Sequence, residues 1–141
     1  MMRVKRLLRS ADGAAAMEFA IVAPTFLMMI FLMLDGGKML FTKQALNDLA
    51  ASAARCAALG STGCTTAGAV QSWVVDRARQ RSQLALTTSM VTITPSTSCN
   101  GQTNMAKAQI NYPYAKGPLQ LLPQSAVPST LTSISCFPVA S

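Results

Sequence analysis

The chain has 141 residues, 50% of them hydrophobic, a formal net charge of +7 and a mean hydropathy of +0.33. This length allows one small domain, and the hydrophobic content is high for a soluble protein of that size. The chain has no histidine, so the usual general base and the commonest neutral metal ligand are both missing. Gly-rich phosphate loops and G-x-S-x-G elbows are absent as well. We therefore expect neither an enzyme nor a cofactor.

The apolar residues are concentrated near the N-terminus. Residues 14–34 form a run of twenty-one in which Glu18 is the single ionisable side chain. A helix of about 20 apolar residues spans the hydrocarbon core of a bilayer. Four cations precede the run, and an excess of cations marks the cytoplasmic side of a membrane helix: Arg3, Lys5, Arg6 and Arg9. The sequence therefore predicts a single-pass anchor with a cytoplasmic N-terminus and an extracytoplasmic C-terminal part.

A cleaved secretory signal is the alternative for such an N-terminus. A signal of this kind needs a small-residue cleavage site after its apolar centre. The apolar run instead ends in "LDGGKMLF", and the small residues 13–16 lie at its N-terminal end. We therefore expect the anchor to be retained.

The helix is expected to continue beyond the membrane as far as Leu59. From residue 38 onward, leucines and alanines recur at helical spacing, and no proline follows Pro24 within this stretch. Gly36 and Gly37 each weaken a helix by roughly 1 kcal/mol relative to alanine, which predicts a bend or hinge there. Gly60 provides a C-terminal stop. These signals predict a transmembrane half at residues 14–35 and an exported half at residues 36–60.

Residues 61–141 are expected to form a small globular head. The stretch from residue 67 to 86 has helical periodicity, with Val70, Trp73, Val74 and Ala78 on one face. After it, "MVTIT", "AKAQINYPY" and "STLTSISCF" alternate with the period of a strand. Asn100 and Gly101 predict a turn after the first strand, and a proline-containing loop separates the second from the third. The predicted fold is α+β: a long N-terminal helix, a second short helix and a three-stranded antiparallel sheet.

The chain has four cysteines, all of which follow the anchor: Cys56, Cys64, Cys99 and Cys136. An even number in a part exposed to an oxidising compartment predicts two disulfides, with three possible connectivities. We prefer Cys56 with Cys64, closing the loop between the helices, and Cys99 with Cys136, joining the first strand to the last. Metal binding is the rival interpretation, but it needs close pairs such as C-x-x-C, and seven residues separate Cys56 from Cys64.

The positive charge has a simple interpretation. Part of it comes from the cations that precede the anchor and set its orientation in the membrane. Arg77, Arg79 and Arg81 form a second, small cluster. Few aromatic residues lie near that cluster, although aromatic stacking platforms are typical of single-strand nucleic-acid sites. We therefore interpret it as a solvated helix face and do not expect nucleic-acid binding. The isolated aspartates Asp35, Asp48 and Asp76 are interpreted as solvated helix residues in the same way.

Glu18 is harder to explain by solvation. A carboxylate at the middle of a bilayer costs about 2.5–3.5 kcal/mol and calls for a partner. A cut after Gly13 would create an α-amino group on Ala14, one helical turn from Glu18. The pair could form within one helix, or between staggered neighbours, where it would set their axial register. A glutamate at the membrane interface, stabilised by a helix N-terminus, is the structural alternative.

The stretch "RSADGAAAMEFAIVAP", followed by the apolar helix and "LFTKQALNDLAASAARCAALG", resembles the TadE-like family of minor pilins, or pseudopilins, of tight-adherence (Flp, type IVb) pili. The resemblance extends from about residue 6 to Gly60. Gly13 before the cut, Glu18 at the fifth mature position and Phe19 at the sixth match the family's prepilin processing motif. The resemblance implies a leader at residues 1–13, cleavage by prepilin peptidase between Gly13 and Ala14, and an assembly and register role for Glu18 and Phe19.

The resemblance also implies partners and a location. The partners are prepilin peptidase, other pilins and minor pilins, the inner-membrane pilus platform and membrane lipid. The protein would be anchored in the inner membrane and from there join the extracellular pilus. Major pilins of this system have almost nothing after the helix, so a head at residues 61–141 favours a minor subunit that primes the filament or lies at its tip. The alternative is a membrane-anchored adhesin or binding module outside any filament, with a ligand surface around Tyr112 and Tyr114.

Overall fold

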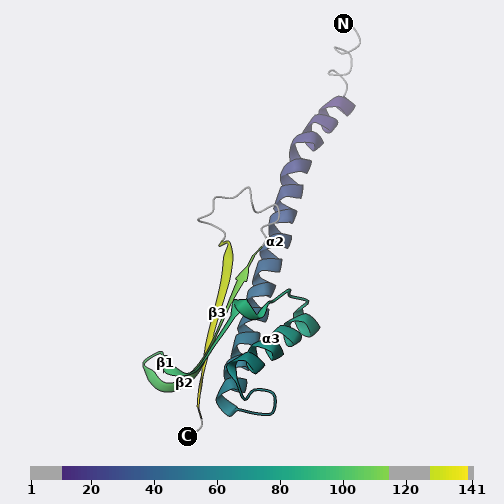
Figure 1. The fold of residues 1–141 in the computed structure, drawn as a ribbon. Coiled ribbons are helices and arrows are strands. Elements are labelled where there is room, and N and C mark those ends of the chain that lie inside the picture. The colour runs from purple at the N-terminus through teal and green to yellow at the C-terminus, as the bar shows by residue number, and fades with distance from the viewer. Residues whose placement is uncertain (1–10, 115–127, 140–141) are drawn as a thin grey trace. The chain divides into compact units, whose positions relative to one another are not determined.

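A computed structural model describes residues 11–114 and 128–139 (Figure 1). The chain divides into two compact units, one ending at Gly37 and one beginning at Lys38. Helix α2, Ala11–Leu59, contributes to both units, and the C-terminal unit also contains helix α3, Ala67–Ser82, and three strands. The predicted leader at residues 1–13 lies mostly outside the described part of the chain.

The N-terminal unit consists of an apolar stretch of α2. The large apolar side chains between Met17 and Leu34 are exposed, among them Phe19 at 74%. An 18-residue window of this helix has a mean hydropathy of 2.1, and none of it is buried within the protein. An apolar helix without a protein core around it is the form expected of a membrane span. Within the described residues, α2 is long and apolar enough to cross a bilayer, as the sequence predicts.

The helix continues through Gly36 and Gly37, where the sequence predicts a bend or hinge. Glycine costs about 1 kcal/mol in a helix, and the flanking helical residues are enough to carry α2 past this pair. The boundary between the two units falls immediately after it.

The interpretation of Asp35 as a solvated residue is wrong, because Asp35 is only 8% exposed.

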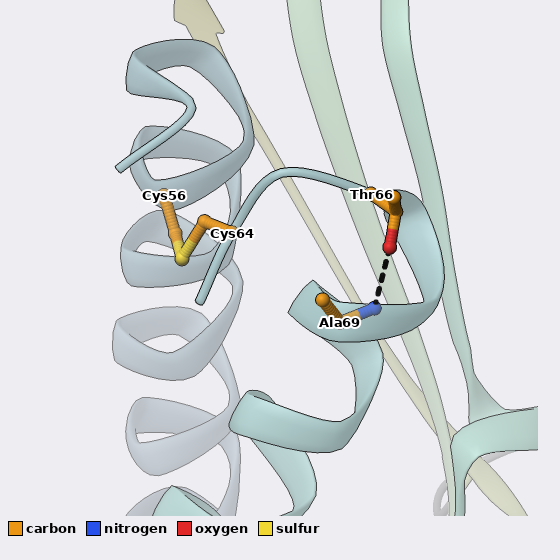
Figure 2. The surroundings of a disulfide bond; sticks show 4 residues. All are labelled: Cys56, Cys64, Thr66 and Ala69. Atoms are coloured by element: carbon orange, nitrogen blue, oxygen red, sulfur yellow. Dashed lines mark hydrogen bonds between the residues drawn. A yellow bond between two sulfur atoms is a disulfide. The ribbon is translucent and has the colours of Figure 1, made fainter. Parts of the chain in front are cut away.

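The end of α2 and the start of α3 follow local sequence signals. Gly60 has a left-handed φ of +56° and donates its N–H to the carbonyl of Cys56 at 3.1 Å. Thr66 caps α3, because its Oγ1 accepts the N–H of Ala69 at 3.2 Å (Figure 2). The helix ends at Ser82, earlier than the periodicity up to residue 86 suggests, because Gln83 adopts a left-handed conformation with φ 52°. A short 3-10 helix η1, Thr88–Met90, leads into the sheet.

The sheet has three antiparallel strands in the order β1-β2-β3. They are β1, Val91–Cys99; β2, Gln102–Pro113; and β3, Thr130–Pro138. Asn100 and Gly101 join β1 to β2 with φ values of 52° and 80°, the conformation of a type I′ hairpin turn. The predicted proline-containing loop between β2 and β3 falls largely on residues outside the described part. The expected α+β fold, with two helices and a three-stranded antiparallel sheet, is confirmed.

One face of the sheet forms the core with the second half of α2 and with α3. Figure 1 shows the strands beside this half of α2, with α3 packed near the same helix. The alternation predicted for β2 holds, because Ala106, Ala108 and Ile110 are all fully buried. The buried residues of the helices are Leu46, Leu49, Ala50, Ala53, Ala54, Val70, Val74 and Ala78. Alanines on α2 leave little side chain between the helix and the sheet, so their backbones can approach closely.

Strand β3 runs alongside the second half of α2. The Ser133 hydroxyl donates to Oδ1 of Asn47 at 2.7 Å, and the Arg55 guanidinium lies 6.0 Å from the centroid of the Phe137 ring. These contacts are eight residues apart on the helix, about 12 Å, and four residues apart on the strand, about 13 Å. Helix and strand are therefore aligned in the same direction over this length.

Candidate functional site

The first candidate site is the start of the apolar helix. Glu18 and Phe19 lie on α2 with exposed side chains, and the backbone at Gly13 and Ala14 is helical. Four residues along a helix correspond to about 6 Å, so Glu18 follows Ala14 by one turn. Between residues 15 and 34 Glu18 is the single charged residue. The arrangement presents one negative charge on an apolar cylinder, which suits an ion pair rather than catalysis.

The second feature is a pair of disulfides. Cys56 and Cys64 are bonded with a Cα–Cα distance of 5.6 Å, and Cys99 and Cys136 with 6.5 Å. This is the connectivity that we preferred from the sequence among the three possible ones. The first bridge closes the connection between α2 and α3 (Figure 2), and the second joins the end of β1 to β3. All four thiols are consumed in these bonds.

A small recess lies against the first disulfide. Its volume is about 270 Å³, and its lining comes from the end of α2, the following loop and α3. The lining residues are Ser52, Arg55, Cys56, Leu59, Ser61, Thr62, Cys64 and Trp73. Sequence reasoning placed Trp73 only on a packed face, whereas the structure leaves it half-buried at this recess. The recess itself was not predicted.

Two arginines stack on aromatic rings at or beside the recess. The Arg55 guanidinium lies 6.0 Å from the Phe137 ring centroid, and that of Arg77 lies 4.9 Å from Trp73. Both distances fall within the range of cation–π attraction. The interpretation of the cluster at residues 77–81 as a purely solvated face is wrong for Arg77, which is half-buried against Trp73, and right for the exposed Arg79 and Arg81.

The two tyrosines considered for a ligand surface are placed differently. Tyr112 and Tyr114 are both half-buried and pack against the hydrophobic core of the head. Tyr112 pairs in register with Leu131 across β2 and β3. Their packing role follows from these contacts and leaves little aromatic surface for a ligand at this position.

Comparison with protein families identifies the N-terminal segment. The family model described as TadE-like protein matches residues 13–55. The match begins at the predicted cleavage position and covers most of α2, and it confirms the resemblance stated from the sequence. The matched segment is therefore similar to the TadE-like family, a structural rather than catalytic family of pilin-like proteins associated with the tight-adherence pilus. Searches of curated proteins and of solved structures gave no match.

Proposed function

We propose that this protein, whose residues 13–55 match the TadE-like family, is a minor pilin. In this proposal prepilin peptidase cuts the chain after Gly13, and the mature protein primes a tight-adherence pilus or lies at its tip. The observation that carries the proposal is Glu18, the single carboxylate of the exposed apolar run at residues 14–34, which lies within the TadE-like match. The family match begins at Gly13, the residue that would precede the cut.

Cleavage after Gly13 gives Glu18 a partner of opposite charge. The cut leaves an α-amino group on Ala14, one turn before Glu18 on α2. In the low dielectric of a bilayer, an unpaired carboxylate is costly, and pairing with the amine of a neighbouring helix relieves that cost. Such a pair fixes how far each helix is displaced along the next. Glu18 would therefore set the axial register of the assembly, with Phe19 packing beside it.

The arrangement of charges and disulfides supports the proposed orientation. Basic residues precede the apolar stretch, and both disulfides lie after it. A cytoplasmic N-terminus and an extracytoplasmic head agree with both facts. From this position the protein would contact the inner-membrane platform and other pilins, and it would pass from the membrane into the filament.

Cleavage is tested by determining the mature N-terminus. Protein extracted from membranes of cells that contain the peptidase should begin at Ala14, by intact-mass and peptide mass spectrometry. A Gly13→Val variant should retain residues 1–13, because a branched side chain replaces the smallest residue at the cut. Gly37→Ala serves as the matched control and should be processed normally. An intact Met1 in the wild-type protein would refute the processing claim.

The register role of Glu18 is tested by removing its charge alone. A Glu18→Gln protein should still insert, since an amide is less costly in the membrane than a carboxylate. It should fail to support piliation, with pili counted by electron microscopy falling at least about tenfold, as expected for a lost ion pair worth about 1.4 kcal/mol or more. Asp48→Asn removes an exposed carboxylate from the exported half of the same helix and should leave pilus numbers unchanged. Wild-type numbers of pili in the Glu18→Gln strain would eliminate the register role.

The adhesin alternative is separated by fractionation. A filament subunit should appear in sheared pili, whereas an anchored module should remain in the cell envelope. Tyr112 and Tyr114, on which that alternative was based, are half-buried against the core of the head, which supports the filament proposal over it.

A further inference from the structure

We propose that the recess beside the Cys56–Cys64 disulfide binds an acidic side chain of a partner protein. The inference concerns the head and does not depend on the fate of the N-terminal helix. Three observations support it. They are the residues that line the recess, the positions of Arg55 in that lining and of Arg77 against the lining residue Trp73, and the small number of carboxylates in the head.

The lining combines an anion-binding group with an apolar wall. Arg55 lines the recess together with Ser52, Ser61 and Thr62, and the side chains of these residues carry guanidinium and hydroxyl groups that can donate hydrogen bonds. Trp73 supplies an aromatic surface. A guanidinium with neighbouring hydroxyls matches the two oxygens of a carboxylate, and charge-assisted hydrogen bonds of this kind are stronger than neutral ones. A volume of about 270 Å³ is below the size of typical drug-like pockets and suits one or two side chains.

The arginines are oriented before any partner arrives. Arg55 lies over Phe137, and Arg77 lies over Trp73. A cation–π contact uses the positive charge of the guanidinium but not its N–H donors, which can still bind an anion. In the part of the chain that the structure describes, both guanidinium groups contact aromatic rings, and neither forms an ion pair with a carboxylate.

The head has few carboxylates of its own to offer. Residues 38–114 and 128–139 contain seven lysines and arginines but only two acidic residues, Asp48 and Asp76. Both aspartates are exposed, and neither lines the recess. Among the described residues of the head, none therefore supplies a carboxylate to Arg55 at the recess.

The apolar rim favours a protein over a free anion. Leu59, which is 54% exposed, and the half-buried Trp73 both line the recess. A simple anion gains nothing from apolar surface, whereas an acidic residue flanked by apolar ones would also bury such surface. Tryptophan and arginine are also the residue types that dominate binding energy at protein interfaces. The Cys56–Cys64 disulfide holds this loop against α2 (Figure 2), and Gly60 has a left-handed φ of +56° at its start. Both features fix the loop in advance, which lowers the ordering cost of binding.

The test uses the single tryptophan of the chain. In full-length protein labelled with ¹⁵N in detergent micelles, the indole N–H gives one resonance, that of Trp73. We expect the blocked tripeptide acetyl-Leu-Glu-Leu-amide to shift this resonance saturably. The matched peptide with glutamine in place of glutamate should bind about tenfold more weakly or not at all, because it lacks the charge that Arg55 meets.

Two variants locate the effect. Arg55→Gln should weaken binding of the glutamate peptide by about tenfold, while Lys43→Gln removes an exposed cation three turns earlier on α2 and should leave it unchanged. Equal shifts with both peptides, or no shift with either, would overturn the proposal without reference to any variant. Acetate alone producing the same shift at the same concentration would reduce the site to a simple anion site and would also overturn it.

Discussion

Two glycines in the head illustrate how backbone conformation, and not space, decides the effect of a substitution. A Cβ added at Gly68 or at Gly101 would meet nothing within 4 Å. Gly101, however, has a φ of +80°, whereas Gly68 lies in the first turn of α3 without a positive φ. We expect Gly101→Ala to lower the free energy of unfolding of the head by about 1 kcal/mol and Gly68→Ala to raise it by about 0.5 kcal/mol.

These opposite signs can be measured by denaturant unfolding in detergent, followed by the fluorescence of Trp73. Each glycine serves as the control for the other, since both gain the same methyl group in open space. Changes of the same sign would contradict the argument from φ.

Residues whose role depends on near neighbours could be predicted from the sequence, and residues placed by distant contacts could not. Gly60 and the Asn100–Gly101 turn carry local backbone signals, and the structure places them as expected. Trp73 and Arg77 stand four residues apart on a helix, so their contact was open to prediction and was overlooked. The contact of Arg55 with Phe137 joins α2 to β3, and no local pattern indicates it.

Among the secondary-structure elements, α3 depends on a single capping residue. The Thr66 side chain accepts the N–H of Ala69, one of the amides that the first turn of a helix leaves without a partner. Thr66→Ala should lower the free energy of unfolding by about 1 kcal/mol and speed amide exchange in the first turn of α3. Hydrogen exchange measured by NMR checks both effects. Thr65→Ala is the matched control, because Thr65 is an exposed threonine directly before Thr66. An equal effect of that substitution would contradict the capping role.

The strands and their faces were predictable because side-chain alternation and burial agree along β2 and β3. The residue at which α3 ends could not be predicted in this way. Leu84 and Leu86 extend the apolar periodicity of the helix, and both pack on the core in the structure, but from a non-helical segment after Gln83. Residues 36 and 37 are both helical although glycine has a low helix propensity, which is a local term that the rest of a long helix can outweigh. The bend or hinge expected at this pair stays a prediction.

For the molecule as a whole, the distribution of apolar residues makes the disulfides important. The large apolar side chains of the N-terminal unit are exposed and so contribute nothing to the core of the head. That core relies on alanines and a few larger residues, of which the largest fully buried ones are Leu46, Ile110, Val70, Val74 and Val91. Small domains with limited cores commonly depend on covalent cross-links for stability.

The two disulfides should contribute unequally, because they close loops of different length. Cys56–Cys64 spans 8 residues and Cys99–Cys136 spans 37. If the bridges act by restricting the unfolded chain, replacing the first pair by serines should cost about 2.5 kcal/mol and replacing the second about 4 kcal/mol. The longer bridge also joins two strands that lack a direct pairing with each other, since β2 lies between them. Unfolding of the two double-serine variants under non-reducing conditions gives the comparison, and an equal or reversed order would show that the loop-closure term does not govern the stability of the head.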